Sequence, residues 1–153
     1  MTTEHPILIC YDDSELAGQA IKIAAELLAG RRAVVLEVGP PLTVEQSIAA
    51  SASPLVVPEF QDENLEGARR GAKAGAELAR RAGFDAEAKA EVYAPAWEGI
   101  VDQAKAIDAA VIVVGSHGRS GASEFLEGSV SHQVAVHADR PVLIVPDGAG
   151  STS

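Results

Sequence analysis

The segment whose residues are best suited to bind a ligand is a run rich in glycine and serine from residue 114 to residue 131, VGSHGRSGASEFLEGSVS. Closely spaced glycines leave backbone N–H groups uncovered, and such groups form concavities that bind anions. Gly128 and Ser129 are expected to open a helix, whose N-terminus favours phosphate oxygens. The cationic side chains of this segment are His117 and Arg119. The pattern predicts a phosphate site built mainly from backbone groups; the alternative is that the glycines only form a tight turn.

Other catalytic patterns are weaker. The chain has neither a Gly-x4-Gly-Lys-Ser/Thr loop nor a Gly-x-Ser-x-Gly elbow, which argues against a P-loop ATPase and a serine hydrolase. His132 and His137 are five residues apart and do not share a helix face, so we expect no metal site. Asp12, Asp13 and Ser14 follow the first apolar run, and we interpret Ser14 as a helix cap rather than as a nucleophile.

Five short runs, four of them apolar and one with alternating apolar residues, are separated by segments of helical periodicity and are expected to be strands. They lie at residues 7–10, 34–38, 86–92, 110–114 and 141–146. Strands that alternate with helices form a parallel sheet covered on both faces, so we predict an α/β fold. A ligand of such a sheet binds beyond the carboxyl ends of the strands, where the strand order reverses. The glycine-rich segment follows the fourth run and therefore stands where that rule places a site.

The patterns also predict how the elements are arranged. Residues 110–114 are the most apolar run and are expected to be central, whereas the alternation in residues 86–92 indicates a strand near an edge. Residues 42–60 have little pattern, and we expect an irregular, mobile insertion there. A long helix is expected from about Gln61 to Arg81. Its glycines at positions 67, 71 and 75 are expected to pack against the sheet rather than against a second copy.

Composition limits the partners. The chain has 153 residues, which fits one domain over residues 1–147 followed by a disordered tail over residues 148–153. Its net charge of -10 repels nucleic acid and anionic lipid, so we expect neither a nucleic-acid nor a membrane partner. The single cysteine, Cys10, cannot form an internal disulfide, and this favours a cytoplasmic location.

The spacing Gly115-x2-Gly118-x9-Gly128-Ser129 resembles the nucleotide-binding signature of the universal stress protein family. The run from Ile7 to Glu15 is similar to the first strand and turn of that family, and the run from Pro141 to Val145 is similar to its last strand. The resemblance implies a five-stranded, Rossmann-like sheet of the adenine nucleotide alpha hydrolase-like type. It also implies a homodimer and, for the ATP-binding branch of the family, an adenine nucleotide as the ligand.

The resemblance implies two groups of site residues. The nucleoside end would be held by Cys10, Asp12 and Val38, and a carboxylate suits a sugar hydroxyl or an adenine amino group. The phosphates and ribose would be held by the remaining candidates, which are Gly115, His117, Gly118, Arg119, Gly128, Ser129, Val130 and Ser131. The chain departs from the family pattern at Asp13, where glycine is usual, and at Glu124 and Glu127. These extra carboxylates are expected to weaken the binding of a triphosphate unless they point away or reach it through Mg2+.

We therefore expect a cytoplasmic stress-response module that binds ATP, with or without Mg2+, and shows a protein partner different surfaces when loaded and when empty. One alternative is a slow ATP hydrolase or nucleotidyl-transfer relative that uses Asp12 or His117. Another is a nucleotide-free dimer that acts as an interaction or holdase module. The last strand is apolar on both faces, and an edge strand of that kind is expected to pair with its copy in a homodimer.

Overall fold

The computed structural model describes residues 5–28, 30–117 and 129–148. Its five strands form one parallel sheet in the order β3-β2-β1-β4-β5. The strands are β1 (Ile7–Cys10), β2 (Arg32–Gly39), β3 (Asp85–Val92), β4 (Val111–Gly115) and β5 (Val142–Val145). The predicted α/β fold is confirmed, and β3 and β5 are the two edges. The fourth strand is an inner strand, as predicted, because β4 lies between β1 and β5, and β1 takes the middle position.

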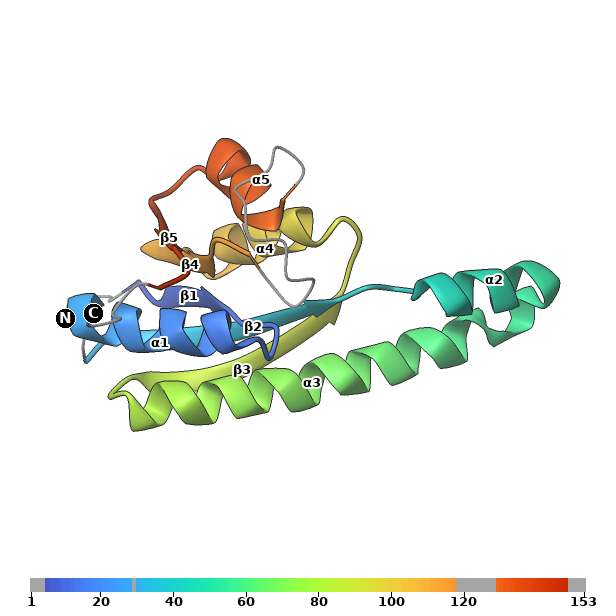
Figure 1. Cartoon of the computed structure of the whole chain (residues 1–153), viewed down its shortest axis with the longest axis horizontal. Helices are drawn as coiled ribbons and strands as arrows, with labels where there is room; N and C mark the ends of the chain where they lie inside the picture. Colours follow the sequence, from blue (N-terminus) through green and yellow to red (C-terminus); the bar gives the residue numbers. More distant parts are fainter. Residues whose placement is uncertain (1–4, 29, 118–128, 149–153) are drawn as a thin grey trace.

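Helices cover both faces of the sheet (Figure 1). On one face α1 (Glu15–Leu28) and α3 (Val57–Arg81) pack together, and on the other face α4 (Ala96–Ala106) packs against α5 (Val130–His137). Each face has its own apolar core, because side chains of a strand alternate between the two sides. In β1, Ile7 and Ile9 are buried under α1 and α3, and Leu8 is buried in the cluster that includes residues of α4.

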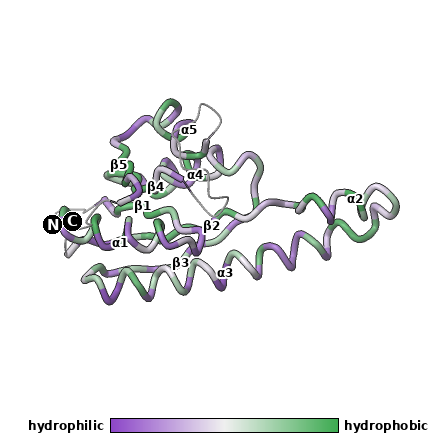
Figure 2. Tube along the Cα trace, viewed as in Figure 1, coloured by the Kyte–Doolittle hydropathy of each residue, from purple (hydrophilic) through white to green (hydrophobic). Residues whose placement is uncertain are grey.

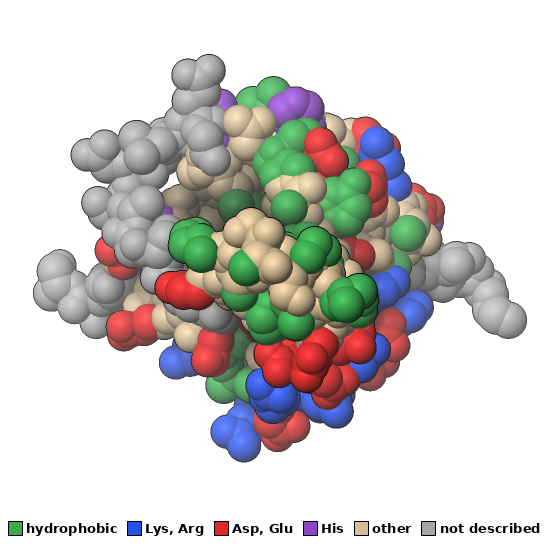
Figure 3. Space-filling view, turned by 90° about the vertical axis from the view of Figure 1, so that its right-hand side faces the viewer, with side chains coloured by type: hydrophobic (Ala, Val, Ile, Leu, Met, Phe, Trp, Pro, Cys, Tyr) green, Lys and Arg blue, Asp and Glu red, His purple; other side chains and the backbone are tan. Residues whose placement is uncertain are grey.

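The expectation of an irregular insertion at residues 42–60 was wrong. This stretch contains α2 (Val44–Ala52), the short helix η1 (Pro54–Val56) and the first turns of α3, which starts about four residues earlier than expected. Together with the adjoining residues of α3 it forms an arm, defined here as residues 42–66, which projects beyond the sheet (Figure 1). Figure 2 shows hydrophobic residues along α2, and Figure 3, which views the arm end on, shows several of them at the surface.

Specific hydrogen bonds explain why the arm is helical. Thr43 and Gln46 form a capping box at the start of α2, in which each side chain bonds to the other residue's backbone N–H. Asn64 of α3 reaches across and donates from Nδ2 to the carbonyl oxygens of Pro40 (3.2 Å) and Pro41 (3.1 Å). It also donates to Oε1 of Gln46 at 2.8 Å. The arm is thus fastened at its base to the end of β2.

Two glycines let α3 lie close to the sheet. A Cβ at Gly75 would stand 2.7 Å from the ring of Tyr11 and 2.8 Å from Cγ1 of Val35, and a Cβ at Gly71 would overlap the buried carboxylate of Glu37. The prediction that this ridge packs on the sheet is confirmed for both positions. Gly67 differs, because a Cβ there would meet only the guanidinium of Arg70, at 3.8 Å.

Gly75→Ala should therefore destabilise the protein by about 1–3 kcal/mol, because the buried ring and the strand behind it cannot move aside. Gly67→Ala is the matched control in the same helix, and there the better helix propensity of alanine should stabilise by about 0.5–1 kcal/mol. Urea unfolding followed by circular dichroism measures both changes. Equal free energies of unfolding in the two variants would contradict the close packing at Gly75.

Candidate functional site

The candidate site lies at the carboxyl ends of β1 and β4, where the strand order reverses. Strands β3 and β2 extend from one side of β1, and β4 and β5 extend from its other side. The pairing of Ile9 with Val113 brings the ends of β1 and β4 level with each other. Crevices at such switch points are where open α/β sheets bind their ligands. The turn after β1 and the segment after β4 therefore meet at one edge.

The turn after β1 is fixed by local hydrogen bonds. The backbone N–H of Tyr11 continues the sheet by donating to the carbonyl of Leu36 (2.9 Å). Oδ1 of Asp12 accepts from the backbone N–H of Ser14 (3.1 Å), and Oγ of Ser14 accepts from the N–H of Ala17 (3.1 Å). The interpretation of Ser14 as a helix cap is confirmed. Asp12 is held half-buried at the end of β1, at the start of α1.

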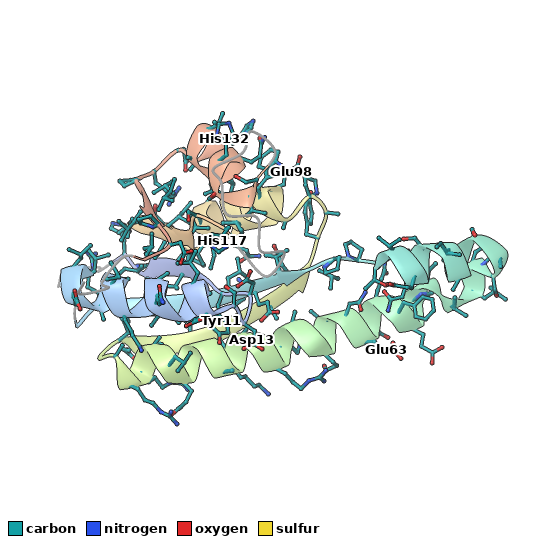
Figure 4. The ribbon with its side chains drawn as sticks, in the orientation of Figure 1. Tyr11, Asp13, Glu63, Glu98, His117 and His132 are labelled. Atoms are coloured by element: carbon teal, nitrogen blue, oxygen red, sulfur yellow. The ribbon has the colours of Figure 1, made fainter. Side chains whose placement is uncertain are left out.

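Asp13 replaces the expected glycine in a backbone conformation that glycine favours. Its φ is 64°, in the left-handed region that aspartate tolerates better than most residues. The hydroxyl of Tyr11 donates to Oδ1 of Asp13 at 3.0 Å. Figure 4 shows Tyr11 and Asp13 together beside α3, apart from His117. The carboxylate that departs from the family pattern is thus bound on the α3 side of the turn.

The environment of Tyr11 and Cys10 keeps both groups protonated. Burial raises the pKa of Tyr11 to about 12, and the hydrogen bond and charge of Asp13 add to the effect. Burial, together with the nearby charge of Asp12, raises the pKa of the Cys10 thiol to about 12. The thiol is therefore neutral at pH 7 and acts as a packing group, not as a nucleophile. Val38, the third residue expected at the nucleoside end, is half-buried near the end of β2.

The segment after β4 is joined to the start of α5. Ser116 continues the sheet by donating its N–H to the carbonyl of Val145 (2.9 Å), and its own carbonyl accepts from Oγ of the buried Ser131 (3.0 Å). Ser129 caps α5, since its Oγ accepts from the N–H of His132 at 3.2 Å. Two parts of the predicted signature, separated by more than ten residues, are thereby brought together. Val130 is exposed on the first turn of α5.

Glycine is required at position 115 because other groups lie close to its Cα. A Cβ at this position would stand 3.1 Å from Cγ of Leu16, in the first turn of α1, and 3.3 Å from the carbonyl oxygen of His117. The segment after β4 therefore passes directly over the start of α1. This contact connects the turn that carries Asp12 to the segment that leads to α5.

His117 is the buried cation candidate of the site. Its side chain is 16% exposed, and its Nε2 lies 3.7 Å from Oδ2 of Asp147, beyond hydrogen-bond distance. Neither ring nitrogen has a hydrogen-bond partner in the part of the chain that the structure describes, although both are buried. A buried polar atom without a partner costs about 1–3 kcal/mol, so a polar ligand at this position would be favoured.

Several predicted residues lie outside the described residues. They are Gly118, Arg119 and Gly128 of the signature, together with the departures Glu124 and Glu127 and the tail beyond residue 148. Within the described ranges no group of three histidine, cysteine or acidic side chains could hold a metal ion. None of the described helices is long and apolar enough to cross a membrane.

These features define a doubly wound α/β protein in which the turn after β1 and the segment that follows β4 meet at the switch point of the sheet. Comparison with protein families assigns the chain more narrowly. The model of the Universal stress protein family matches residues 4–146, nearly the whole chain. The chain belongs to the universal stress protein family, as the signature at residues 115–129 indicated.

Individual relatives agree with this assignment. The chain is 34% identical over 146 residues to Universal stress protein YxiE of Bacillus subtilis (strain 168), which covers 91% of this chain and 97% of the relative. It is similar to the structure of a universal stress protein from Archaeoglobus fulgidus, with a TM-score of 0.68 and 26% identity, covering 92% of this chain and 97% of that one. A structure of the Archaeoglobus fulgidus protein in complex with dAMP matches with a TM-score of 0.66 and 23% identity, covering 94% and 99%.

Two contacts at the site were not foreseen from the sequence. The bond between Tyr11 and Asp13 depends on the left-handed backbone at Asp13, for which glycine in the family pattern was the available signal. The bond from Ser131 to the carbonyl of Ser116 depends on the position of α5 relative to β4. The sequence places a serine at the right position but does not show what it bonds to.

Asp13→Asn should lower the pKa of Tyr11 from about 12, because the substitution removes the neighbouring negative charge while keeping a side chain that tolerates the left-handed backbone. The measurement is a titration of phenolate ultraviolet absorbance. Glu98→Gln is the matched control, since Glu98 is the main cause of the raised pKa of Tyr93. It should lower the pKa of Tyr93 alone, and Tyr93→Phe assigns the two signals. An unchanged pKa of Tyr11 in Asp13→Asn would show that Asp13 does not contribute to the raised value.

Proposed function

We propose that the chain is a cytoplasmic, ATP-binding regulatory module of the stress response, in which the nucleotide occupies the carboxyl edge of β1 and β4. The observation that carries this proposal is the bond from Ser131 to Ser116, which fastens the N-terminus of α5 to the segment after β4. A capped helix N-terminus beside a glycine-rich segment directs backbone N–H groups at one place, the arrangement that binds phosphate. The dAMP complex of the Archaeoglobus fulgidus protein supports an adenine nucleotide as the ligand.

The charges of the described residues favour one orientation of the nucleotide. Asp12 repels phosphate, so it suits the adenosine end, where Cys10 offers a neutral, partly buried surface and Val38 an apolar one. The phosphates then lie toward Ser129 and His117, whose buried ring nitrogens need polar partners. Gly118, Arg119 and Gly128 complete this end of the proposed site. Where Mg2+ accompanies ATP, it would offset part of the negative charge of the phosphates.

The regulatory part of the proposal rests on the same connection. A nucleotide that bonds both to the segment after Gly115 and to the start of α5 favours one arrangement of the two, and it thereby changes the surface that a protein partner meets. The proposed activity is binding rather than turnover. Mass spectrometry of nucleotide released from the denatured protein, followed by incubation with added ATP, separates the two: retained ATP supports the module, and ADP or AMP formation supports a slow hydrolase.

Asp12→Ala should weaken the binding of ATP and of adenosine by the same factor, roughly tenfold or more, because it removes an acceptor at the nucleoside end. Arg119→Ala should weaken the binding of ATP and leave the affinity for adenosine nearly unchanged. Isothermal titration calorimetry measures all four affinities. Asp85→Ala is the control, since Asp85 is an exposed acid at the start of β3, and the proposed site is at the other, carboxyl ends of the strands. The same selectivity in the Asp12 and Arg119 variants would contradict the proposed orientation.

We also propose that the protein forms a homodimer through β5. Among the described strands β5 has one neighbour, β4, and its other edge leaves backbone groups without a strand partner. Val142, Leu143 and Ile144 are each partly exposed in the single chain. Antiparallel pairing with the same strand of a second copy satisfies both edges about a two-fold axis. Pro141 and Pro146 flank the strand and limit the ladder to the residues between them.

Ile144→Lys should shift the protein toward monomer, because it places a charge in the centre of the proposed ladder. Ile144 is the informative position, since Val142 and Leu143 also pack against the two cores and Ile144 belongs to neither. Light scattering after gel filtration at micromolar concentration measures the mass. Val136→Lys, on an exposed residue of α5, is the control and should leave the mass unchanged. A wild-type monomer under these conditions would overturn the proposed dimer.

A further inference from the structure

The arm presents large apolar side chains to solvent. Val44 is 75% exposed, Ile48 is 68% exposed and Leu55 is 92% exposed. Val44 and Ile48 are one helical turn apart on the same face of α2, and the only buried residue of that helix is Ala50. Most other exposed apolar residues of the described chain are single, such as Leu27 on α1, and single exposures are normal. Val44, Ile48 and Leu55 instead all lie on the segment formed by α2 and η1, and we call these three residues the arm patch.

The arm patch is carried on an ordered support. The capping box of α2 fixes its first turn, and the three bonds donated by Asn64 hold that turn against α3 and the end of β2. A helix whose apolar face were needed for folding would turn that face inward. Here the helix is held by polar contacts at its start, while its apolar face is left outward. Packing within the chain therefore does not account for Val44, Ile48 and Leu55.

Acidic side chains lie beside the patch, and we call this group the acidic rim. Residues 33–68 contain no lysine or arginine, and the arm carries Glu45 on α2 and Glu59, Asp62, Glu63 and Glu66 on α3. All five are exposed, and of these Glu66 is paired with Arg69. Figure 3 shows a red group of acidic side chains directly beside the green end of the arm. An apolar centre with a negative rim is complementary to a surface with an apolar centre and a positive rim.

We propose that the arm patch is a docking surface for a cationic amphipathic helix of a partner protein. The apolar stripe of the partner covers Val44, Ile48 and Leu55, and its lysine and arginine side chains face the acidic rim. Apolar residues one turn apart on the partner helix have the same spacing as Val44 and Ile48 on α2, so the two rows can pack against each other. This inference is independent of the proposed nucleotide site, because no residue of the arm patch belongs to that site.

The charges disfavour two other occupants. Anionic lipid is repelled by the same acidic rim that attracts a cationic helix. A second copy of the arm would bring two negative rims together around one apolar contact, which costs free energy at each pair of like charges. The partner helix must therefore supply the positive charge that residues 33–68 lack.

The test uses the full-length protein and a fluorescent peptide of about 18 residues, made of leucine and lysine arranged with helical periodicity. Fluorescence anisotropy measures its affinity. Ile48→Ser and Leu55→Ser should each weaken binding roughly tenfold, the value expected for losing one buried apolar side chain. Leu27→Ser is the matched control, since Leu27 is 63% exposed on α1, and it should leave the affinity unchanged.

Charge is tested in the same assay. Glu63→Gln should weaken the binding of the peptide severalfold, whereas Glu26→Gln, on an exposed acid of α1, should not change it. A peptide of the same composition with its periodicity scrambled, and a periodic leucine–glutamate peptide, should both bind much more weakly. Equal loss in Leu27→Ser and Ile48→Ser, or equal binding of the scrambled peptide, would overturn the proposal by showing general attraction to an acidic protein. Self-association that Ile48→Ser abolishes, or binding to phosphatidylserine vesicles through the patch, would overturn it in favour of another occupant.

Discussion

The close approach of α3 to the sheet is the constraint on which most of the structure depends. Every buried position of this helix is alanine or glycine, so its axis lies near β2 and β3 and its own side chains add little to the distance. Tyr11 fits only because Gly75 has no Cβ, and the carboxylate of Glu37 fits only because Gly71 has none. The same helix then continues past the sheet and supports the arm. One small-residue face thus supplies a core, positions the residue next to Asp12, and carries a projecting surface.

The two functional regions are separated by this arrangement and built on different principles. At the carboxyl ends of the strands, backbone geometry determines the site. Parallel strands end together there, and the hydroxyl of Ser131 bonds α5 to the segment after β4. On the arm, the side-chain hydrogen bonds of Thr43, Gln46 and Asn64 provide the support, and exposed apolar side chains supply the surface. A substitution at the sheet edge must keep a special backbone conformation, as the left-handed Asp13 does, whereas most positions of α2 are exposed and make no such demand.

Much of the fold could be predicted from the sequence, for clear physical reasons. Strands buried on both faces are continuous apolar runs, so Ile7–Cys10 was predicted to the residue, and the signature spacing identified the family. The arm was mispredicted because its helix buries only Ala50, which leaves little amphipathic pattern to detect. Thr43 and Gln46, at capping-box spacing, were the available signal. The contacts of Tyr11 and Ser131 could not be predicted, because they depend on where separate elements lie in space.

The length of α3 has a mechanical consequence. Asn64 bonds to the end of β2, and Val57 lies seven residues before it, which corresponds to about 10 Å of helix. This first part of α3 projects beyond the sheet and supports α2 (Figure 1). In mechanical terms the arm is a short cantilever, clamped by the bonds of Asn64 and backed by the close packing of α3 at Gly71 and Gly75.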